Sequence, residues 1–197
     1  MVRKTVFAIG AALMAMSTAT SAVASDENDW AWCTGRTDTF PEWQISGCTK
    51  IIQSGGETRE NLAVAFNNRG KAYNGKGEYD RAIQDYDQAI RLKPDYAEAF
   101  YNRGSVYNAK SQYDPAIQDY DQAIRLKRDY AEAFNNRGTA YAAKGQYDRA
   151  IEDYDEAIRL MPDYANAFFN RAHAYAAKGQ YDRALQDYDQ AERLIPG

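Results

Sequence analysis

The chain has 197 residues, a length that suits one domain or two small ones. With 45% hydrophobic and 26% charged residues, its composition excludes wholesale disorder and a protein with several membrane spans. The net charge of −4 leaves no basic excess to neutralise nucleic-acid phosphates, so we predict no nucleic-acid partner. One histidine and two cysteines are too few for a dedicated zinc or iron–sulfur site, so we predict no metal.

Residues 1–24 have the features of a secretory signal peptide. Arg3 and Lys4 form a basic start, residues 5–16 form an apolar run, and small residues lead up to Ala24. The apolar run is shorter than the roughly 20 residues of a membrane span. We therefore expect cleavage before Ser25 and no stable membrane insertion afterwards, rather than an uncleaved anchor. The sequence predicts an exported protein of the periplasm or the medium.

Residues 25–62 are expected to form an N-terminal cap segment. In an oxidising compartment, the pair Cys33 and Cys48 predicts one disulfide, with two free thiols as the alternative. Residues 41–53 are expected to form one helix. We expect this helix to cover the first of the units described next and to be held by the disulfide; the alternative is a partly ordered tail.

From residue 63 onward, one pattern occurs four times with a period of 34 residues. The units are 63–96, 97–130, 131–164 and 165–197. Each unit contains Phe-x-Asn-Arg followed by a small residue, beginning at Phe66, Phe100, Phe134 and Phe168. Apolar and small residues then return at steps of three and four on both sides of a Gly- or Ser-containing turn, which predicts two helices in each unit.

This pattern resembles the tetratricopeptide-repeat family, in which bulky, Gly, Tyr, Ala and Pro residues recur at fixed offsets over 34 residues. The resemblance implies an all-α fold: a right-handed superhelical solenoid of four helix hairpins, here with a disulfide-tied N-terminal cap helix. Stacked hairpins bury a continuous core between neighbours. Glu192 stands where the earlier units have isoleucine, so we expect the last helix to face water.

Catalysis is not predicted. The single histidine, His173, is accompanied by no nucleophile motif, phosphate-binding loop or metal-ligand spacing, so we predict neither enzyme activity nor a cofactor. Each second helix carries an Asp-Tyr-Asp triplet, such as Asp85-Tyr86-Asp87. Residues two apart point to different sides of a helix. We therefore expect these carboxylates to pair with arginines such as Arg69 inside each hairpin, rather than to bind calcium or act as an acid–base pair.

The resemblance also implies a binding surface, because the first helices of this family line a concave face that takes extended peptides. One asparagine recurs there in every unit: Asn68, Asn102, Asn136 and Asn170. A primary amide both donates and accepts hydrogen bonds, so this ladder can hold a peptide backbone. The alternative is that the asparagines bond adjacent helices within the stack.

Other candidate contacts lie near the ladder. Tyr101 and Phe169 occupy the preceding position in the second and fourth units, and we expect these aromatic rings, outside the stack, to anchor apolar side chains of a partner. The alternative is surface variation without consequence. Lys71 and His173 lie on the same predicted face.

The sequence thus predicts a protein–protein interaction scaffold of the cell envelope that binds an extended segment of a protein partner. Two alternatives remain: a structural protein that self-assembles into homo-oligomers through residues 185–194, and an accessory subunit of an envelope enzyme.

Overall fold

The computed structural model describes residues 27–35 and 40–195. The predicted signal peptide and its cleavage site lie outside these residues. Every regular element in the described part is a helix: α1 (Glu27–Cys33), α2 (Pro41–Gln53), α3 (Arg59–Gly75), α4 (Tyr79–Leu92), α5 (Ala97–Ala109), α6 (Tyr113–Leu126), α7 (Ala131–Ala143), α8 (Tyr147–Leu160), α9 (Ala165–Ala177) and α10 (Tyr181–Leu194). Among them, none combines the length and the apolar character that crossing a membrane requires.

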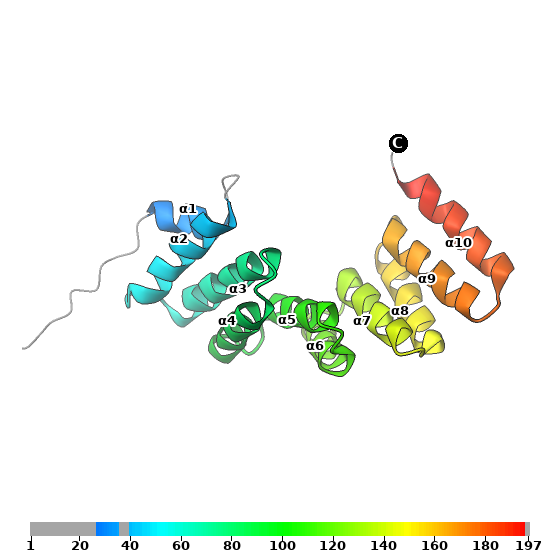
Figure 1. Ribbon diagram of the computed structural model, residues 1–197, viewed down its shortest axis with the longest axis horizontal. Helices are drawn as coiled ribbons and strands as arrows, with labels where there is room; N and C mark the ends of the chain where they lie inside the picture. The colour runs from blue at the N-terminus through cyan, green and yellow to red at the C-terminus, as the bar shows by residue number, and fades with distance from the viewer. Residues whose placement is uncertain (1–26, 36–39, 196–197) are drawn as a thin grey trace, which may run out of the picture.

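The helices form a solenoid of hairpins. Each of the four units is one hairpin, α3–α4, α5–α6, α7–α8 and α9–α10, and each second helix also packs against the first helix of the next unit. Figure 1 shows the hairpins following one another in a curved row, with α1 and α2 at one end and α10 at the other. The predicted all-α solenoid of four hairpins is confirmed.

Each hairpin turn depends on one residue in the left-handed backbone region. After α3, Gly77 has a φ of 74°, and the backbone N–H groups of Gly77 and Glu78 donate to the carbonyl groups of Asn74 and Tyr73. Glycine takes this conformation without a steric penalty and so closes the helix end. The second unit places Ser111 there with a φ of 58°.

Tyrosine packed on glycine fills the centre of three hairpins. Tyr86, Tyr120 and Tyr154 are at most 2% exposed. The ring of Tyr154 lies over Gly138 so closely that a Cβ atom there would stand 2.8 Å from the ring's Cε1. In the fourth unit, Ala172 stands at the glycine position and the matching Tyr188 is only partly buried.

This contact predicts that Gly138→Ala destabilises the protein despite the better helix propensity of alanine. Overpacking in a well-packed core costs about 1–3 kcal/mol, against a propensity gain of up to about 1 kcal/mol. Urea denaturation followed by circular dichroism measures the change. Gly75→Ala is the matched control, because a Cβ at Gly75 meets no atom within 4 Å. A Gly138→Ala variant as stable as Gly75→Ala would contradict the packing argument.

A helical pair precedes the first repeat. The disulfide Cys33–Cys48 joins α1 to α2, and α2 packs against α3. Both half-cystines are fully buried together with Ile51. The predicted cap helix is therefore present as α2, whereas α1 was not anticipated from the sequence, because seven residues are too few to display a helical period.

Candidate partner-binding site

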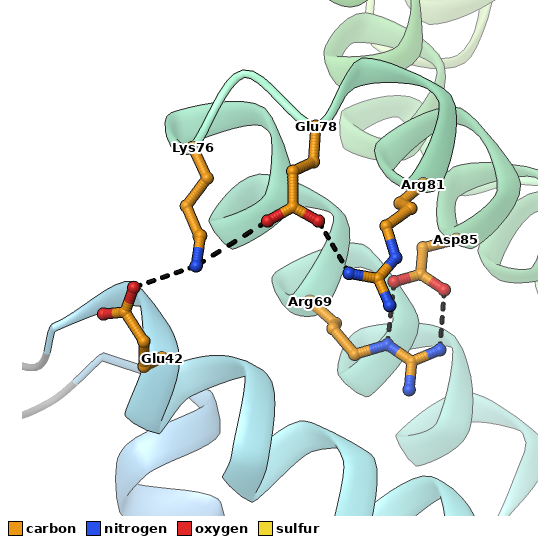
Figure 2. Close-up of polar contacts among 6 residues, drawn as sticks. All are labelled: Glu42, Arg69, Lys76, Glu78, Arg81 and Asp85. Carbon is orange, nitrogen blue, oxygen red and sulfur yellow. Dashed lines mark hydrogen bonds and ion pairs between the residues drawn. The ribbon is translucent and has the colours of Figure 1, made fainter.

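A buried ion pair ties the two helices of every hairpin together. In the first unit, Nε and Nη2 of Arg69 donate to the two carboxylate oxygens of Asp85, both at 2.8 Å (Figure 2). The same bidentate pair recurs in the other units, as Arg103–Asp119, Arg137–Asp153 and Arg171–Asp187. The predicted pairing within the hairpins is confirmed for the first aspartate of each Asp-Tyr-Asp triplet. It is wrong for the second aspartate of the first three triplets, which pairs with the arginine of the next unit.

The same arginines also join neighbouring units. Nη1 of Arg103 donates to Asp87 of the preceding unit at 2.5 Å. The equivalent contacts are Arg137–Asp121 and Arg171–Asp155. Each of these arginines therefore neutralises two carboxylates. In the described residues no group of three or more His, Cys, Asp or Glu side chains is placed to hold a metal ion.

A lysine at the end of the first helix completes each interface between units. The contacts are Lys110–Asp80, Lys144–Asp114 and Lys178–Asp148. In each case the aspartate stands in the first turn of the preceding second helix, and the lysine caps the end of the next first helix. Every interface between repeats thus has two ionic contacts whose carboxylates are seven residues apart.

Helix α2 supplies the same contacts to the first repeat. Glu42 accepts from Lys76 at 2.9 Å, and Thr49 Oγ1 accepts from Nη1 of Arg69 at 3.0 Å. Figure 2 shows Lys76 between Glu42 and Glu78. Glu42 and Thr49 are seven residues apart, like the aspartates of the later interfaces, so α2 takes the place of a preceding repeat's second helix.

The asparagine ladder is bonded across the stack. The amide nitrogen of Asn102 donates to Asn67 Oδ1 at 3.0 Å, and that of Asn170 donates to Asn135 Oδ1 at 2.9 Å. Between them, the amide nitrogen of Asn136 donates to the hydroxyl oxygen of Tyr101 at 3.0 Å. These hydrogen bonds correspond to the alternative interpretation, in which the asparagines bond adjacent helices within the stack.

The expectation that Tyr101 lies outside the stack is wrong. Its hydroxyl accepts from Asn136, and its ring centroid lies 4.9 Å from that of Tyr130 in the same unit's last turn. Asn, Tyr and Asn at this position share one property, a side-chain oxygen that accepts from the next unit. In three of the four units this position therefore contributes a hydrogen bond between units, and Phe169 is the exception.

The ladder keeps some hydrogen-bonding capacity. Each of Asn102, Asn136 and Asn170 uses one of its two amide hydrogens in the stack, and the carbonyl oxygens of Asn102 and Asn170 have no partner among the described residues. The side chain of Asn68 makes no hydrogen bond within that part of the chain. These groups are partly accessible and occupy the same position in each unit.

The aromatic cluster of the last unit differs from the rest of the ladder. Phe169 is 50% exposed, and its ring packs edge-on against His173 and Tyr188, with centroids 4.6 and 5.6 Å away. Phe169 has no oxygen to accept from a neighbour. Of the predicted anchors, it is the one that presents an apolar surface to solvent.

Lys71 occupies the position whose side chain, in the next two units, bonds the hydroxyl group of the buried tyrosine. Ser105 and Thr139 occupy its place in the next two units, where their hydroxyl groups lie 3.4 Å from the hydroxyls of Tyr120 and Tyr154. A lysine cannot accept a hydrogen bond. The hydroxyl of Tyr86 is accordingly buried without a partner in the described structure, while Lys71 reaches out to Glu98 at 3.5 Å.

Comparison with protein families gives matches over most of the repeat region. The model described as TPR repeat matches residues 70–111, 104–145 and 138–179. The model described as Tetratricopeptide repeat matches residues 165–197. No curated protein matches the chain.

Solved structures of similar fold include several of the protein MamA. One, described as a crystal structure of MamA, has 27% sequence identity and a TM-score of 0.73, and the match covers 87% of this chain and 96% of that one. A second has 26% identity and a TM-score of 0.71, with 85% and 92% covered. A third, MamA from residue 41 to the end from Desulfovibrio magneticus RS-1, has 21% identity and a TM-score of 0.72, with 87% and 97% covered.

Proposed function

Because the chain belongs to the tetratricopeptide-repeat family, we propose that it is a protein–protein interaction scaffold whose concave face binds an extended segment of a partner protein. The observation that carries this proposal is the ladder of Asn68, Asn102, Asn136 and Asn170. Its last three amides are held in place by the stack. Each keeps one amide hydrogen, and Asn102 and Asn170 also keep a carbonyl oxygen without a partner among the described residues.

The hydrogen bonds within the stack favour this role because they fix the asparagines before a partner arrives. A side chain that is already ordered loses little rotamer freedom on binding. Each new hydrogen bond to a peptide backbone contributes about 0.5–1.5 kcal/mol net. A few such bonds give moderate affinity with little dependence on the partner's sequence.

Selectivity is proposed to come from the side chains beside the ladder. Phe169 offers an apolar ring at one end, with His173 against it. Near the other end, Lys71 is half exposed and only loosely paired with Glu98. These groups favour a partner segment with an apolar side chain and an acidic side chain several residues apart.

The proposed location is the periplasm or the extracellular medium. The support is the disulfide between Cys33 and Cys48, since disulfides persist in oxidising compartments, together with the signal-like features of residues 1–24. Export places the partner in the cell envelope or outside the cell.

Substitution of Asn68 and Phe169 by alanine is expected to weaken partner binding about tenfold or more, since Asn68 makes no hydrogen bond within the described residues and Phe169 is half exposed. The partner segment is first identified by crosslinking the mature protein in envelope extract. Its affinity for each variant is then measured by calorimetry. Asn136→Ala is unsuitable alone, because it also removes a bond to Tyr101.

The control is Asp129→Ala, in the exposed turn before α7. Unchanged affinity of the Asn68→Ala, Phe169→Ala variant would contradict binding in the groove. The alternative of self-assembly through residues 185–194 predicts concentration-dependent oligomers in light scattering. An accessory subunit of an envelope enzyme predicts that the crosslinked partner is that enzyme.

A further inference from the structure

Every earlier second helix contacts the first helix of the next unit, but no described helix contacts the outer face of α10 in this way. The helices α4, α6 and α8 are each covered by the first helix of the next unit. Figure 1 shows α10 at the end of the row, with no described helix beyond it. The same amino-acid pattern nevertheless continues into α10, which begins Tyr181-Asp182 and contains Asp187-Tyr188-Asp189.

Two carboxylates on α10 lack the cations that their equivalents bind. Asp182 corresponds to Asp148, which pairs with Lys178, and Asp189 corresponds to Asp155, which pairs with Arg171. Within the described residues Asp182 and Asp189 make no ion pair or side-chain hydrogen bond. The two carboxylates of an interface between repeats are therefore present on α10, seven residues apart, without the lysine and arginine that pair with them elsewhere.

Apolar side chains beside and between these carboxylates are also uncovered. Leu185 is 61% exposed, whereas the equivalent Ile117 is 9% exposed under the next repeat. Tyr181 is 67% exposed. Such a patch with charges at both ends has the composition of an interaction surface.

The internal interfaces define what fits such a face. Each covering helix carries an arginine, a small apolar residue three positions later and a lysine seven positions after the arginine. In α7 these are Arg137 and Ala140, with Lys144 as the C-cap residue. Residues at i, i+3 and i+7 share one side of a helix, so the three contacts form together.

The charge on α10 further restricts the occupant. Glu192 is exposed at the position where the earlier units have isoleucine, which adds a carboxylate and removes an apolar contact. Arg183 belongs to its own hairpin, where it lies over the ring of Tyr175 at 5.6 Å. The face is therefore more acidic and less apolar than the internal interfaces, and it suits a basic helix bound through salt-sensitive contacts.

A second copy of this chain does not supply that helix at its exposed end. The first helix with the required residues, α3, is covered by α2, which already occupies Arg69 and Lys76. The outermost helix at that end, α1, has the sequence ENDWAWC, with no basic residue. Neither of these two helices therefore supplies the complementary charge.

We propose that the outer face of α10 is a docking surface for a helix of a partner protein that carries arginine and lysine seven residues apart, with a small apolar residue between them. This surface is distinct from the groove proposed above, since Asn68 and the ladder do not contribute to it.

The test uses a lactam-bridged helical peptide with the sequence of residues 131–146, labelled for fluorescence anisotropy and shown to be helical by circular dichroism. The peptide is expected to bind the full chain, and Asp182→Asn with Asp189→Asn to weaken binding about tenfold. Replacing its arginine and lysine by glutamine is expected to have the same effect. Asp129→Asn with Asp163→Asn, two exposed turn residues, is the matched control and leaves binding unchanged.

Failure of the helical peptide to bind, or equal binding to the Asp182→Asn, Asp189→Asn variant, would overturn the proposal. Self-association of the chain that disappears in the same variant would identify a second copy as the occupant and also overturn it. Groove binding of an extended segment is unaffected by this variant, so the two proposals fail separately.

Discussion

Replacement of Arg137 by methionine is expected to lower the free energy of unfolding by about 3–5 kcal/mol, because it leaves a buried carboxylate without its cation. Asp153 is 5% exposed and receives two hydrogen bonds from Arg137. Burial raises the pKa of Asp153 above its ordinary value, and the hydrogen bonds of Arg137 oppose that shift. Without Arg137, burial still disfavours the charged form of Asp153, and no hydrogen bonds from the arginine offset this effect. Urea denaturation followed by circular dichroism measures the loss.

Two further variants separate the buried charge from a general effect of removing arginine. Arg159→Met removes a guanidinium that pairs with Glu156 three residues away on an exposed surface, and exposed pairs of this kind contribute at most about 1 kcal/mol. In the double variant Arg137→Met, Asp153→Met no uncompensated charge is buried, so most of the lost stability is expected to return. A single Arg137→Met variant as stable as Arg159→Met would contradict this account.

The sequence predicted the hairpins because the 34-residue period repeats every structural position four times. It also predicted that arginines such as Arg69 pair with the carboxylates of the Asp-Tyr-Asp triplets inside each hairpin, because both recur in every unit. It did not predict the second pairing. Arg103 lies sixteen residues after Asp87 and sixteen before Asp119, so spacing alone does not tell which carboxylate it meets. The structure shows that it meets both.

The candidate site was harder to predict because side-chain direction is set by the packing of neighbouring units. Asn67 and Asn102 are adjacent in their repeats' patterns, yet Asn67 is fully buried and accepts from Asn102 of the next unit. A period gives the position along each helix but not which side chain turns inward. The shared oxygen of Asn67, Tyr101 and Asn135 was a usable signal: all three accept hydrogen bonds, and Phe169 does not.

The cap illustrates the same limit. Glu42 and Thr49 are seven residues apart, as are Asp80 and Asp87. This spacing was visible in the sequence, but residues 41–53 share too little with a repeat for the match to stand out. The contacts of Glu42 and Thr49 with the first repeat show that the interface is defined by a few polar positions. In α10, Asp182 and Asp189 keep the same spacing but have no such contacts among the described residues.

Alkaline pH is expected to destabilise the protein steeply, because its hairpins bury tyrosine side chains. Burial raises the pKa of Tyr154 to about 12, and it also raises the pKa values of Tyr86 and Tyr120 from the ordinary value of 10.0. Above pH 10 the unfolded chain releases phenolic protons that the folded chain retains. The unfolded state then binds fewer protons, so stability falls as pH rises. Each of the three tyrosines contributes a loss of about 1.4 kcal/mol per pH unit.

The stabilising effect of the neutral tyrosines is fully present below about pH 10, and for Tyr154 it is lost between pH 10 and its folded pKa of about 12. Urea midpoints measured from pH 8 to 11.5 follow this loss. Tyr154→Phe is expected to make the decline shallower, whereas Tyr181→Phe, at a ring that is 67% exposed, is expected to leave it unchanged. Equal slopes for both variants would show that buried phenols do not govern the alkaline transition.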